Sequence, residues 1–502
     1  AASMRPSPKA LIIGAGMGGL SAAVELAAAG VEVTLCERAA APGGKMRQVA
    51  VGDARLDAGP TVFTMRWVFE ELFAAAGQSL EERLSLKAAE VLARHAWTDG
   101  SRLDLFASRQ RSAEAIAAFS SPAEGRRYLE FCKQAGGIYE TLRDPYIRGH
   151  RTNPVGLVGR VGPGRIGGLL RIKPFATMWS ELCRSFTDPR LRQLFGRYAT
   201  YAGSSPFLAP ATLMLIAHVE QEGVWLVGGG IHRLASSLAT VAEGLGVDVR
   251  YGTQVEEILV SGRRARGARL AGGETVTADA VIFNGDAAAL PMGLLGDAVR
   301  RAVPAADPAD RSLSAVIWNL VAVTSGLPLI HHTVCFSGDY PAEVDAIFRR
   351  GEPPTEPTVY VCAQDRDDAG AWPAGEPERL LVLMNAPARG DTRPLTAQEV
   401  EQCADRTFSL LERCGLRIER QPEASRVTTP AGFEALFPAT GGALYGRASH
   451  GWKASFSRPG ARSAIPGLYL AGGSTHPGAG VPMAALSGRL AASSVLEDLA
   501  ST

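Results

Sequence analysis

The N-terminal part of the chain alternates between the pattern of a buried strand and the pattern of a helix. A short apolar run from Lys9 to Ile13 is typical of a strand buried on both faces of a parallel sheet. The Ala- and Leu-rich segment up to Ala29 predicts a helix that Gly30 ends, and residues 31–36 predict a second strand. These elements indicate a β–α–β unit and therefore an α/β domain.

Similar patterns return much later in the chain. Residues 234–243 predict a helix, and apolar runs predict strands at 247–251, 254–260, 276–284 and 468–470. Pro482 occupies the place where an N1 proline begins a final helix. We expect these separated segments to join the first unit in one Rossmann-like domain.

The turn after the first strand carries a dinucleotide fingerprint. Gly14, Gly16 and Gly19 have the G-x-G-x-x-G spacing: the first permits a tight turn, the second lets the backbone approach a pyrophosphate, and the third lets helix and strand pack closely. The helix N-terminus faces the anion. Glu37 ends the second strand, about 20 residues downstream, where a carboxylate suits the hydroxyls of an adenosine ribose.

A second glycine pair, Gly43-Gly44, follows the acidic residue. The run from Glu37 to Arg47 resembles the extended signature of flavoprotein oxidoreductases of the amine oxidase and phytoene desaturase superfamily. The two glycines let backbone amides approach phosphates and a ribityl chain. Lys45 or Arg47 offsets negative charge, unless both are plain surface cations. The resemblance implies FAD rather than a nicotinamide cofactor.

The C-terminal motif narrows the resemblance. The stretch Thr475-His-Pro-Gly-Ala-Gly-Val-Pro is similar to the terminal motif of carotenoid desaturases of the bacterial phytoene desaturase family. A helix N-terminus here stabilises the anion that forms when a flavin is reduced. The runs beginning at Asp57, Val224 and His331 extend the similarity over essentially the whole chain. Residues 64–73 resemble the branch that introduces the C3–C4 double bond into 1-hydroxy- or 1-methoxy-neurosporene-type carotenoids.

The resemblance implies a set of FAD-binding residues and a domain division. The residues are Gly14, Gly16, Gly18, Gly19, Glu37, Arg38, Gly44, Lys45, Gly59, Pro60, Thr61, Val255, Asn284, Asp286, Gly472, Gly473, Gly480, Val481, Pro482 and Met483. The predicted fold is a Rossmann-like FAD-binding domain with a parallel sheet and an inserted α+β substrate-binding domain. The FAD-binding domain is expected at 9–61, 223–299 and 456–502, and the substrate-binding domain at 62–222 and 300–455.

Composition excludes other classes of function. The chain has 502 residues, enough for two or more domains, and its net charge of +1 gives no case for nucleic-acid binding. Seven cysteines lie without a C-x-x-C pair, which predicts reduced thiols, a cytoplasmic protein and no metal site. Neither a transmembrane run nor a signal peptide is recognisable, and residues 1–3, ahead of Met4, are expected to be foreign to the natural protein.

The predicted chemistry is hydride transfer from C4 of the carotenoid to the flavin, followed by loss of a proton from C3. The base is not identified by the sequence. His218, Glu220, His331 and His332 are candidates, and each has the alternative of a structural polar residue satisfied by its neighbours. The terminal electron acceptor is expected to be oxygen or a quinone.

A carotenoid resides in the bilayer, so the enzyme must reach a membrane. Residues 147–175 hold arginines and a lysine among apolar residues without one acidic side chain, which is typical of a segment that docks on lipid. The alternative is a solvated basic loop. We expect peripheral attachment to the inner or photosynthetic membrane. Two interpretations are open for a group of four aromatic residues: they line a substrate tunnel, or they belong to the ordinary hydrophobic core. These residues are Phe63, Trp67, Phe69 and Phe73.

Alternative functions on the same fold stay open at this stage. Amine oxidases and protoporphyrinogen oxidases share the FAD motifs but lack the C-terminal run at Thr475 and the run at His331. A phytoene desaturase, or a non-redox carotene isomerase or cyclase, shares more of the pattern. A pure carotenoid-binding protein leaves the flavin motifs unexplained.

Overall fold

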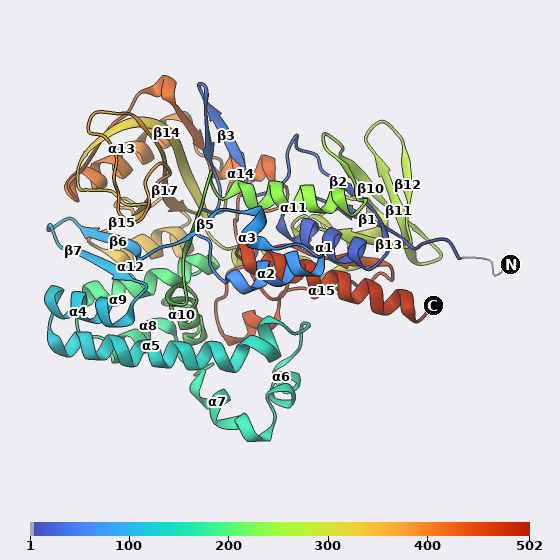
Figure 1. Ribbon diagram of the computed structural model, residues 1–502, viewed down its shortest axis with the longest axis horizontal. Helices are drawn as coiled ribbons and strands as arrows, with labels where there is room; N and C mark the ends of the chain where they lie inside the picture. Colours follow the sequence, from blue (N-terminus) through green and yellow to red (C-terminus); the bar gives the residue numbers. More distant parts are fainter. Residues whose placement is uncertain (1–4) are drawn as a thin grey trace.

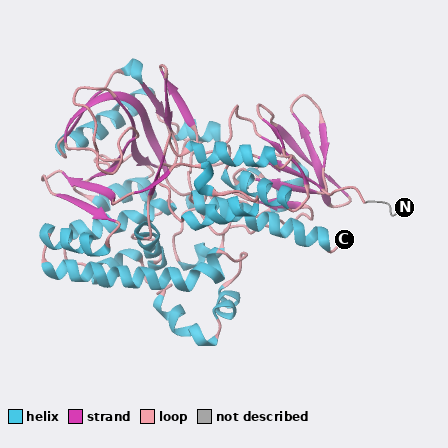
Figure 2. Ribbon diagram, viewed as in Figure 1, coloured by secondary structure: helices cyan, strands magenta, loops and turns pink. Residues whose placement is uncertain are grey.

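The computed structural model describes residues 5–502, so the expectation about residues 1–3 lies outside the described residues. Two larger sheets lie toward opposite ends of the molecule, and a layer of helices lies below one of them (Figures 1 and 2). The second half of the chain returns twice to the sheet with which the first half begins.

A five-stranded parallel sheet combines three distant segments. Its spatial order is β20 (Leu468–Leu470), β13 (Ala280–Phe283), β1 (Lys9–Ile13), β2 (Glu32–Cys36) and β9 (Asp248–Arg250). Successive side chains of β1 enter different cores: Ala10 and Ile12 face one side of the sheet, and Leu11 faces the other. This burial on both faces explains the uninterrupted apolar run.

Helices cover one face of this sheet and a small antiparallel sheet covers the other. The helices are α1 (Met17–Ala28), α11 (His232–Gly244) and α15 (Val481–Ala500), and the covering strands are β10 (Val255–Ser261), β11 (Arg264–Leu270) and β12 (Thr275–Thr277). The single strand predicted at 276–284 is wrong. The segment divides into β12, which pairs with β11, and β13, which pairs with β1, because the chain changes sheets between them.

The eight-stranded sheet lies at the other end of the molecule. Its order is β18 (Leu416–Glu419), β14 (Ser314–Gly326), β17 (Glu378–Ala386), β16 (Val359–Ala363), β15 (His332–Phe336), β6 (Val91–Trp97) and β7 (Arg102–Phe106), with β19 (Ser425–Thr428) also paired to β14. In β14, Val316 packs toward the side covered by α13 (Ala397–Arg413), whereas Ile317 packs toward the helical layer.

The helical layer below this sheet comes mainly from residues 109–221. Its helices are α4 (Arg109–Phe119), α5 (Pro122–Leu142), α6 (Pro154–Val161), α7 (Ile166–Arg171), α8 (Met178–Ser185), α9 (Pro189–Gly196) and α10 (Leu215–Gln221). In Figure 1, α6 and α7 project from the bottom of the layer.

Shorter elements complete the described fold. They are β3 (Gln48–Val51), β4 (Ala54–Asp57), α2 (Arg66–Ala75), α3 (Leu80–Arg83), β5 (Leu86–Ala88), β8 (Trp225–Val227), α12 (Tyr340–Asp345) and α14 (Pro430–Leu436). Phe63, Phe69 and Phe73 are buried in the core that packs on the parallel sheet, and Trp67 packs against it. These four aromatics therefore form core rather than a tunnel wall.

Candidate active site

The glycines of the first turn have different structural roles, which the surroundings of each missing Cβ reveal. A Cβ on Gly19 would lie 1.9 Å from the carbonyl oxygen of Gly14, and a Cβ on Gly18 would lie 2.5 Å from Oδ1 of Asn284, so both serve close packing. Gly16 has an ordinary backbone conformation and precedes α1 as its N-cap. Its Cβ position faces Asn284 Nδ2 at 3.2 Å, and no side chain caps the helix. Uncapped amides at this helix end suit an anion.

The second glycine pair lies against the first turn. Gly43 pairs with Gly16 as an isolated parallel bridge, and a Cβ on Gly44 would lie 3.0 Å from the Gly16 Cα. Glu37 sits beside them, accepting hydrogen bonds from the amides of Ala15 at 2.9 Å and Ala39 at 2.8 Å. The structure therefore brings the two glycine motifs and the acidic residue together.

Asn284 completes this cluster from the end of β13. Its Nδ2 donates to the Gly14 carbonyl at 3.2 Å, whereas its buried Oδ1 has no partner among the described residues. Gly472, at the end of β20, packs against the same side chain. A buried amide oxygen without a donor is costly unless a ligand or water supplies one. The cluster thus contains a hydrogen-bond acceptor without a protein donor at the place where a cofactor is predicted.

The final helix begins at the edge of the cavity described below. Gly480 is the N-cap of α15 and has no side-chain cap, and the helix starts at Val481, so Pro482 is its second residue rather than its first. A Cβ would meet open space at both Gly473 and Gly480. The 20-residue helix therefore directs uncapped amides toward this region.

A partly buried lysine and a buried arginine approach the same place. Lys45 donates through Nζ to the Leu444 carbonyl at 2.9 Å, and burial lowers its pKa while Asp286 opposes that shift. Arg458, which the sequence analysis missed, donates to the Gly473 carbonyl at 2.6 Å, and burial lowers its pKa to about 10. The alternative of surface cations is thereby excluded for Lys45, and Arg47 is also partly buried, donating to the Thr428 hydroxyl at 3.0 Å.

The remaining predicted cofactor residues lie in different settings. Gly59, Pro60 and Thr61 line the cavity, as do Val481, Pro482 and Met483. Val255 is buried where β10 packs on the parallel sheet. Arg38 is exposed, and its guanidinium donates to the carbonyls of Ala435 and Leu436, so it holds the end of α14.

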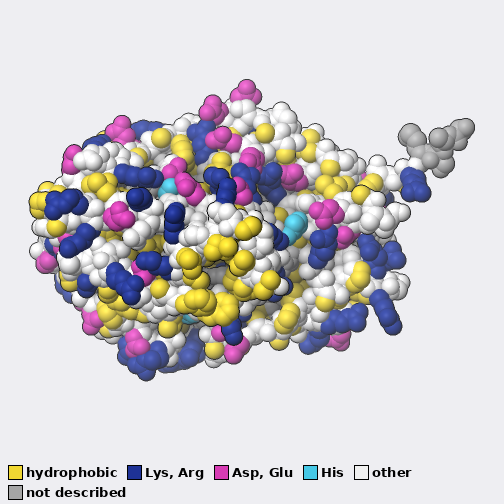
Figure 3. All heavy atoms as spheres, turned by 90° about the horizontal axis from the view of Figure 1, so that it is seen from below, with side chains coloured by type: hydrophobic (Ala, Val, Ile, Leu, Met, Phe, Trp, Pro, Cys, Tyr) yellow, Lys and Arg dark blue, Asp and Glu magenta, His cyan; other side chains and the backbone are white. Residues whose placement is uncertain are grey.

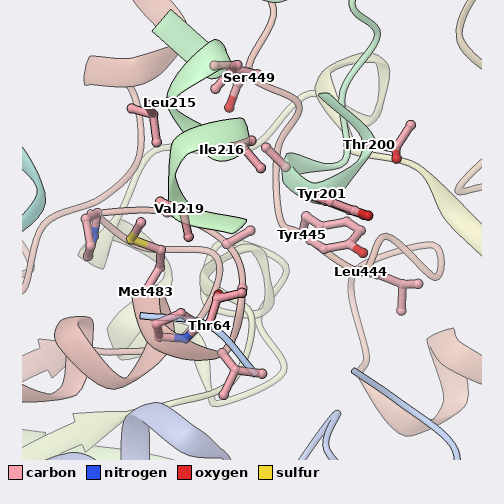
Figure 4. A pocket seen from close by; sticks show the side chains of 18 of the residues that line it. Thr64, Thr200, Tyr201, Leu215, Ile216, Val219, Leu444, Tyr445, Ser449 and Met483 are labelled. Atoms are coloured by element: carbon pink, nitrogen blue, oxygen red, sulfur yellow. The ribbon is translucent and has the colours of Figure 1, made fainter. Parts of the chain in front are cut away.

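A cavity of about 380 Å³ lies between the predicted cofactor segments and the helical layer. Its lining is largely apolar and includes Leu215, Ile216 and Val219 of α10 and Met483 of α15, whose side chains Figure 4 shows around one space. The smaller polar share of the wall includes charged side chains, so the site suits a ligand that is largely apolar and makes some polar contacts.

The four catalytic candidates are placed differently. Glu220 lines the cavity, accepts a hydrogen bond from the Tyr198 hydroxyl at 3.0 Å, and is the only carboxylate among the described lining residues. Burial raises its pKa to about 7, against the opposing effects of Tyr198 and Arg197. His218 lines a separate small cavity, and burial lowers its pKa.

His332 lies behind the cavity wall. Its Nδ1 is 2.6 Å from the Tyr360 hydroxyl, which is 2.7 Å from the Thr61 hydroxyl, and both partners line the cavity. His331, His332 and Cys362 bring one ligand atom each within 4.8 Å of one another, a donor set suited to a soft metal ion, although the sequence predicts no metal site. The pairing of β15 with β16 creates this cluster, which separated sequence positions do not reveal.

Comparisons with known proteins agree with this geometry. The family described as flavin containing amine oxidoreductase matches residues 179–496, and the NAD(P)-binding Rossmann-like domain matches residues 12–75. The chain is 56% identical over 495 residues to a hydroxyneurosporene desaturase of Rubrivivax gelatinosus, covering 98% of this chain and 94% of that protein. It is 46% identical over 496 residues to a hydroxyneurosporene desaturase of Cereibacter sphaeroides, covering 98% of each.

The chain belongs to the carotenoid desaturases of the flavin-containing amine oxidoreductase family. This member of the family is a flavin-dependent oxidoreductase, and the predicted family and fold class are confirmed. A solved oxidoreductase from Methanosarcina mazei has the same fold, with a TM-score of 0.61 at 18% identity over 97% of this chain and all of that one. The glycine cluster, the unpartnered Asn284 oxygen and the start of α15 fit a flavin dinucleotide.

The basic residues of the predicted docking segment of this carotenoid desaturase are of two kinds, those bound by other groups of the protein and those without such a partner. Arg148 pairs with Glu71 at 2.9 Å, Arg160 donates to the carbonyls of Pro145 and His150, and Lys173 pairs with Glu181. Within the described chain, Arg165 and Arg171 make no such contact. Within residues 5–502, Arg165 and Arg171 are therefore the cations of this comparison that the protein leaves free for another partner.

Apolar side chains of the same segment are exposed beside the cavity. Leu170 and Phe175 are 75% and 79% exposed, and the Phe175 ring packs on Trp452, which lines the cavity. Viewed from below, hydrophobic side chains gather around a hollow (Figure 3). No helix within residues 5–502 combines the length and apolarity needed to span a bilayer.

Proposed function

We propose that the enzyme uses FAD to introduce a C3–C4 double bond into an acyclic carotenoid that carries a 1-hydroxy or 1-methoxy group. The high identity to two hydroxyneurosporene desaturases along almost the whole chain carries this proposal. The largely apolar cavity supports it, because a polyene needs a water-excluding wall along much of its length.

The glycine cluster supports the choice of FAD. Glu37 would hold the adenosine ribose, and the turns at Gly16 and Gly44 would hold the pyrophosphate, since both present backbone without side chains. The start of α15 would face the flavin ring, where its dipole favours negative charge. When bound, FAD supplies the two-electron acceptor that takes a hydride from C4 of the carotenoid.

Glu220 is proposed as the acceptor of the C3 proton. It is the described carboxylate that reaches the cavity, and its pKa near 7 suits a general base at neutral pH. Neither His218 nor His332 lines this cavity, so both fit the structural alternative. The apolar lining keeps water from the reacting carbons, which leaves the carboxylate as the proton acceptor.

A panel of carotenoids tests the proposed reaction. In liposomes, the FAD-loaded enzyme should lengthen the conjugated system of 1-hydroxy- and 1-methoxy-neurosporene by one double bond, with a red shift in the spectrum and a mass loss of two hydrogens. Conversion of phytoene with the oxygenated substrates left unchanged would assign the enzyme to phytoene desaturation. Isomerised carotenoid of unchanged mass would favour the non-redox alternative.

We also propose that residues 147–175 dock the enzyme on the cytoplasmic side of the inner or photosynthetic membrane, with oxygen or a quinone as terminal acceptor. Leu170 and Phe175 of this segment are exposed, and Phe175 packs on Trp452 in the wall of the cavity that would receive a carotenoid from the bilayer. Arg165 and Arg171 are available for lipid phosphates, and each contributes on the order of 1 kcal/mol near an anionic surface.

Reversing those two charges tests the docking surface. The double variant Arg165→Glu/Arg171→Glu should bind anionic vesicles at least roughly tenfold less well, because about 2 kcal/mol of attraction is replaced by repulsion. Co-sedimentation measures the effect. The exposed pair Arg126→Glu/Arg301→Glu makes the same change in net charge elsewhere and should sediment like the wild type. Equal sedimentation of both double variants would place the membrane face elsewhere.

A further inference from the structure

One arginine of the cavity wall is buried without the partners that such a group needs. Arg197 follows α9, lines the cavity and is only 8% exposed. Its Nη1 donates to the Tyr201 hydroxyl at 3.3 Å, its buried Nε has no partner, and its side chain makes no further hydrogen bond and no ion pair within residues 5–502. A guanidinium has five donors, and leaving them unpaired in an apolar site is expensive.

The surroundings of Arg197 hold it in place and leave it short of acceptors. The guanidinium lies over the rings of Tyr201 and Tyr360, at 5.5 and 6.0 Å from their centroids. Thr200, Tyr201 and Asn385 are further polar residues of the same wall, and Figure 4 shows Tyr201 beside Tyr445. A buried guanidinium with unpaired donors on the wall of a largely apolar cavity marks a place where a ligand atom can accept hydrogen bonds.

Arg197 shares the cavity with Glu220, the proposed base. The positive charge of Arg197 opposes the upward shift in the pKa of Glu220. In a 1-oxygenated carotenoid the oxygen is attached two carbons away from C3, the carbon that loses its proton. One bound end group can therefore present its oxygen to Arg197 and C3 to Glu220.

We infer that Arg197 is the centre of a subsite that binds the C1 oxygen of the carotenoid end group, an inference that rests on the proposed function. Arginine only donates hydrogen bonds, and a hydroxyl oxygen and an ether oxygen can both accept them. A hydrocarbon end group leaves the guanidinium unpaired in the closed site, and sites built to bind an oxygen reject analogues that lack it. The subsite thus selects oxygenated ends without distinguishing hydroxy from methoxy.

The test compares matched substrates. The wild type should turn over 1-hydroxy- and 1-methoxy-neurosporene with similar kcat/KM, and 1,2-dihydroneurosporene, which lacks the oxygen, at least roughly a hundredfold less well. Arg197→Met keeps length and apolar volume. Because Arg197 also lowers the pKa of Glu220, the rates are compared well above that pKa. There Arg197→Met should lower kcat/KM for the oxygenated substrates roughly 10- to 100-fold without lowering that for the hydrocarbon, so the selectivity collapses.

Two controls separate this subsite from a structural role. Arg197→Lys keeps a charged donor and should retain part of the selectivity, whereas Arg192→Met removes a partly buried arginine outside the cavity and should retain all of it. The inference would be overturned if Arg197→Met lost kcat/KM equally on every substrate. It would also be overturned, without any variant, if the wild type turned over the hydrocarbon as well as the oxygenated substrates. A wild type that converts none of the three substrates would instead overturn the proposed function.

Discussion

Glu220→Gln should lower carotenoid turnover by roughly 10²- to 10⁴-fold while the flavin stays bound, because an amide cannot accept the C3 proton. The substitution keeps the size of the side chain and an oxygen for the Tyr198 hydroxyl, which donates to Glu220 at 3.0 Å. Turnover of 1-hydroxyneurosporene in liposomes measures the loss.

Glu343→Gln is the matched control. Glu343 is also buried and has a pKa raised by burial to about 7, but it is not among the residues that line the cavity. It should keep nearly wild-type turnover. A small loss in Glu220→Gln, or an equal loss in Glu343→Gln, would contradict the role of Glu220.

The pH dependence follows from the same carboxyl group. The base works only when ionised, so wild-type activity should rise with pH through about 7 and fall about tenfold per unit below it. Tyr198→Phe removes a hydrogen bond that lowers the pKa of Glu220, so the profile should move to higher pH.

Stability should respond in the opposite sense to activity. The folded-state pKa of Glu220 lies above the ordinary value of 4.5, so this group contributes stability that is fully present below that value and is lost as pH rises through about 7. A neutral Gln avoids the loss. At pH 8 the free energy of unfolding of Glu220→Gln should therefore exceed that of the wild type by up to about 3 kcal/mol. A variant that is inactive yet more stable than the wild type has lost chemistry and is not misfolded.

Gly16→Val should abolish stoichiometric flavin binding, with less than roughly a tenth of the FAD retained on purification. The backbone at Gly16 has a conformation that any residue adopts. An added Cβ, however, would lie 3.2 Å from Asn284 Nδ2, so the valine side chain would fill the space between the turn and Asn284. The flavin absorbance per chain measures the result. Glu37→Ala should weaken binding by roughly 10- to 100-fold, because it removes a charged hydrogen-bond acceptor.

Two other glycines serve as controls for that experiment. Gly137→Ala lies within α5, where an added Cβ meets no atom within 4 Å, and should keep full flavin content. Gly19→Ala would place its Cβ 1.9 Å from the Gly14 carbonyl oxygen and should destabilise the fold itself. Full FAD content in Gly16→Val would show that the cofactor binds elsewhere.

Local patterns predict the parallel sheet and the glycine motifs well. The turn at Gly14 and the acid at Glu37 depend on residues close in sequence, so spacing alone places them on a strand, a turn and a second strand. The strand at 468–470 is confirmed for the same reason. By contrast, the predicted strand at 276–284 hides a change of pairing partner that only the tertiary structure decides.

The cavity could not be assembled from sequence. His218 and Glu220 are both buried on α10, yet only Glu220 reaches the main cavity, because the packing of α10 fixes which side chain faces it. Arg197 has no motif, and its importance appears only from its burial and missing partners. Similarly, the sequence does not distinguish the free arginines of residues 147–175 from the paired ones, because the backbone carbonyls that accept their hydrogen bonds are positioned only by the fold.

Anaerobic mixing of the FAD-loaded enzyme with 1-hydroxyneurosporene tests the central claim most directly. Flavin absorbance should be bleached by one equivalent for each C3–C4 double bond formed, without any added reductant or oxygen. Unchanged flavin absorbance together with unchanged or merely isomerised carotenoid would contradict it.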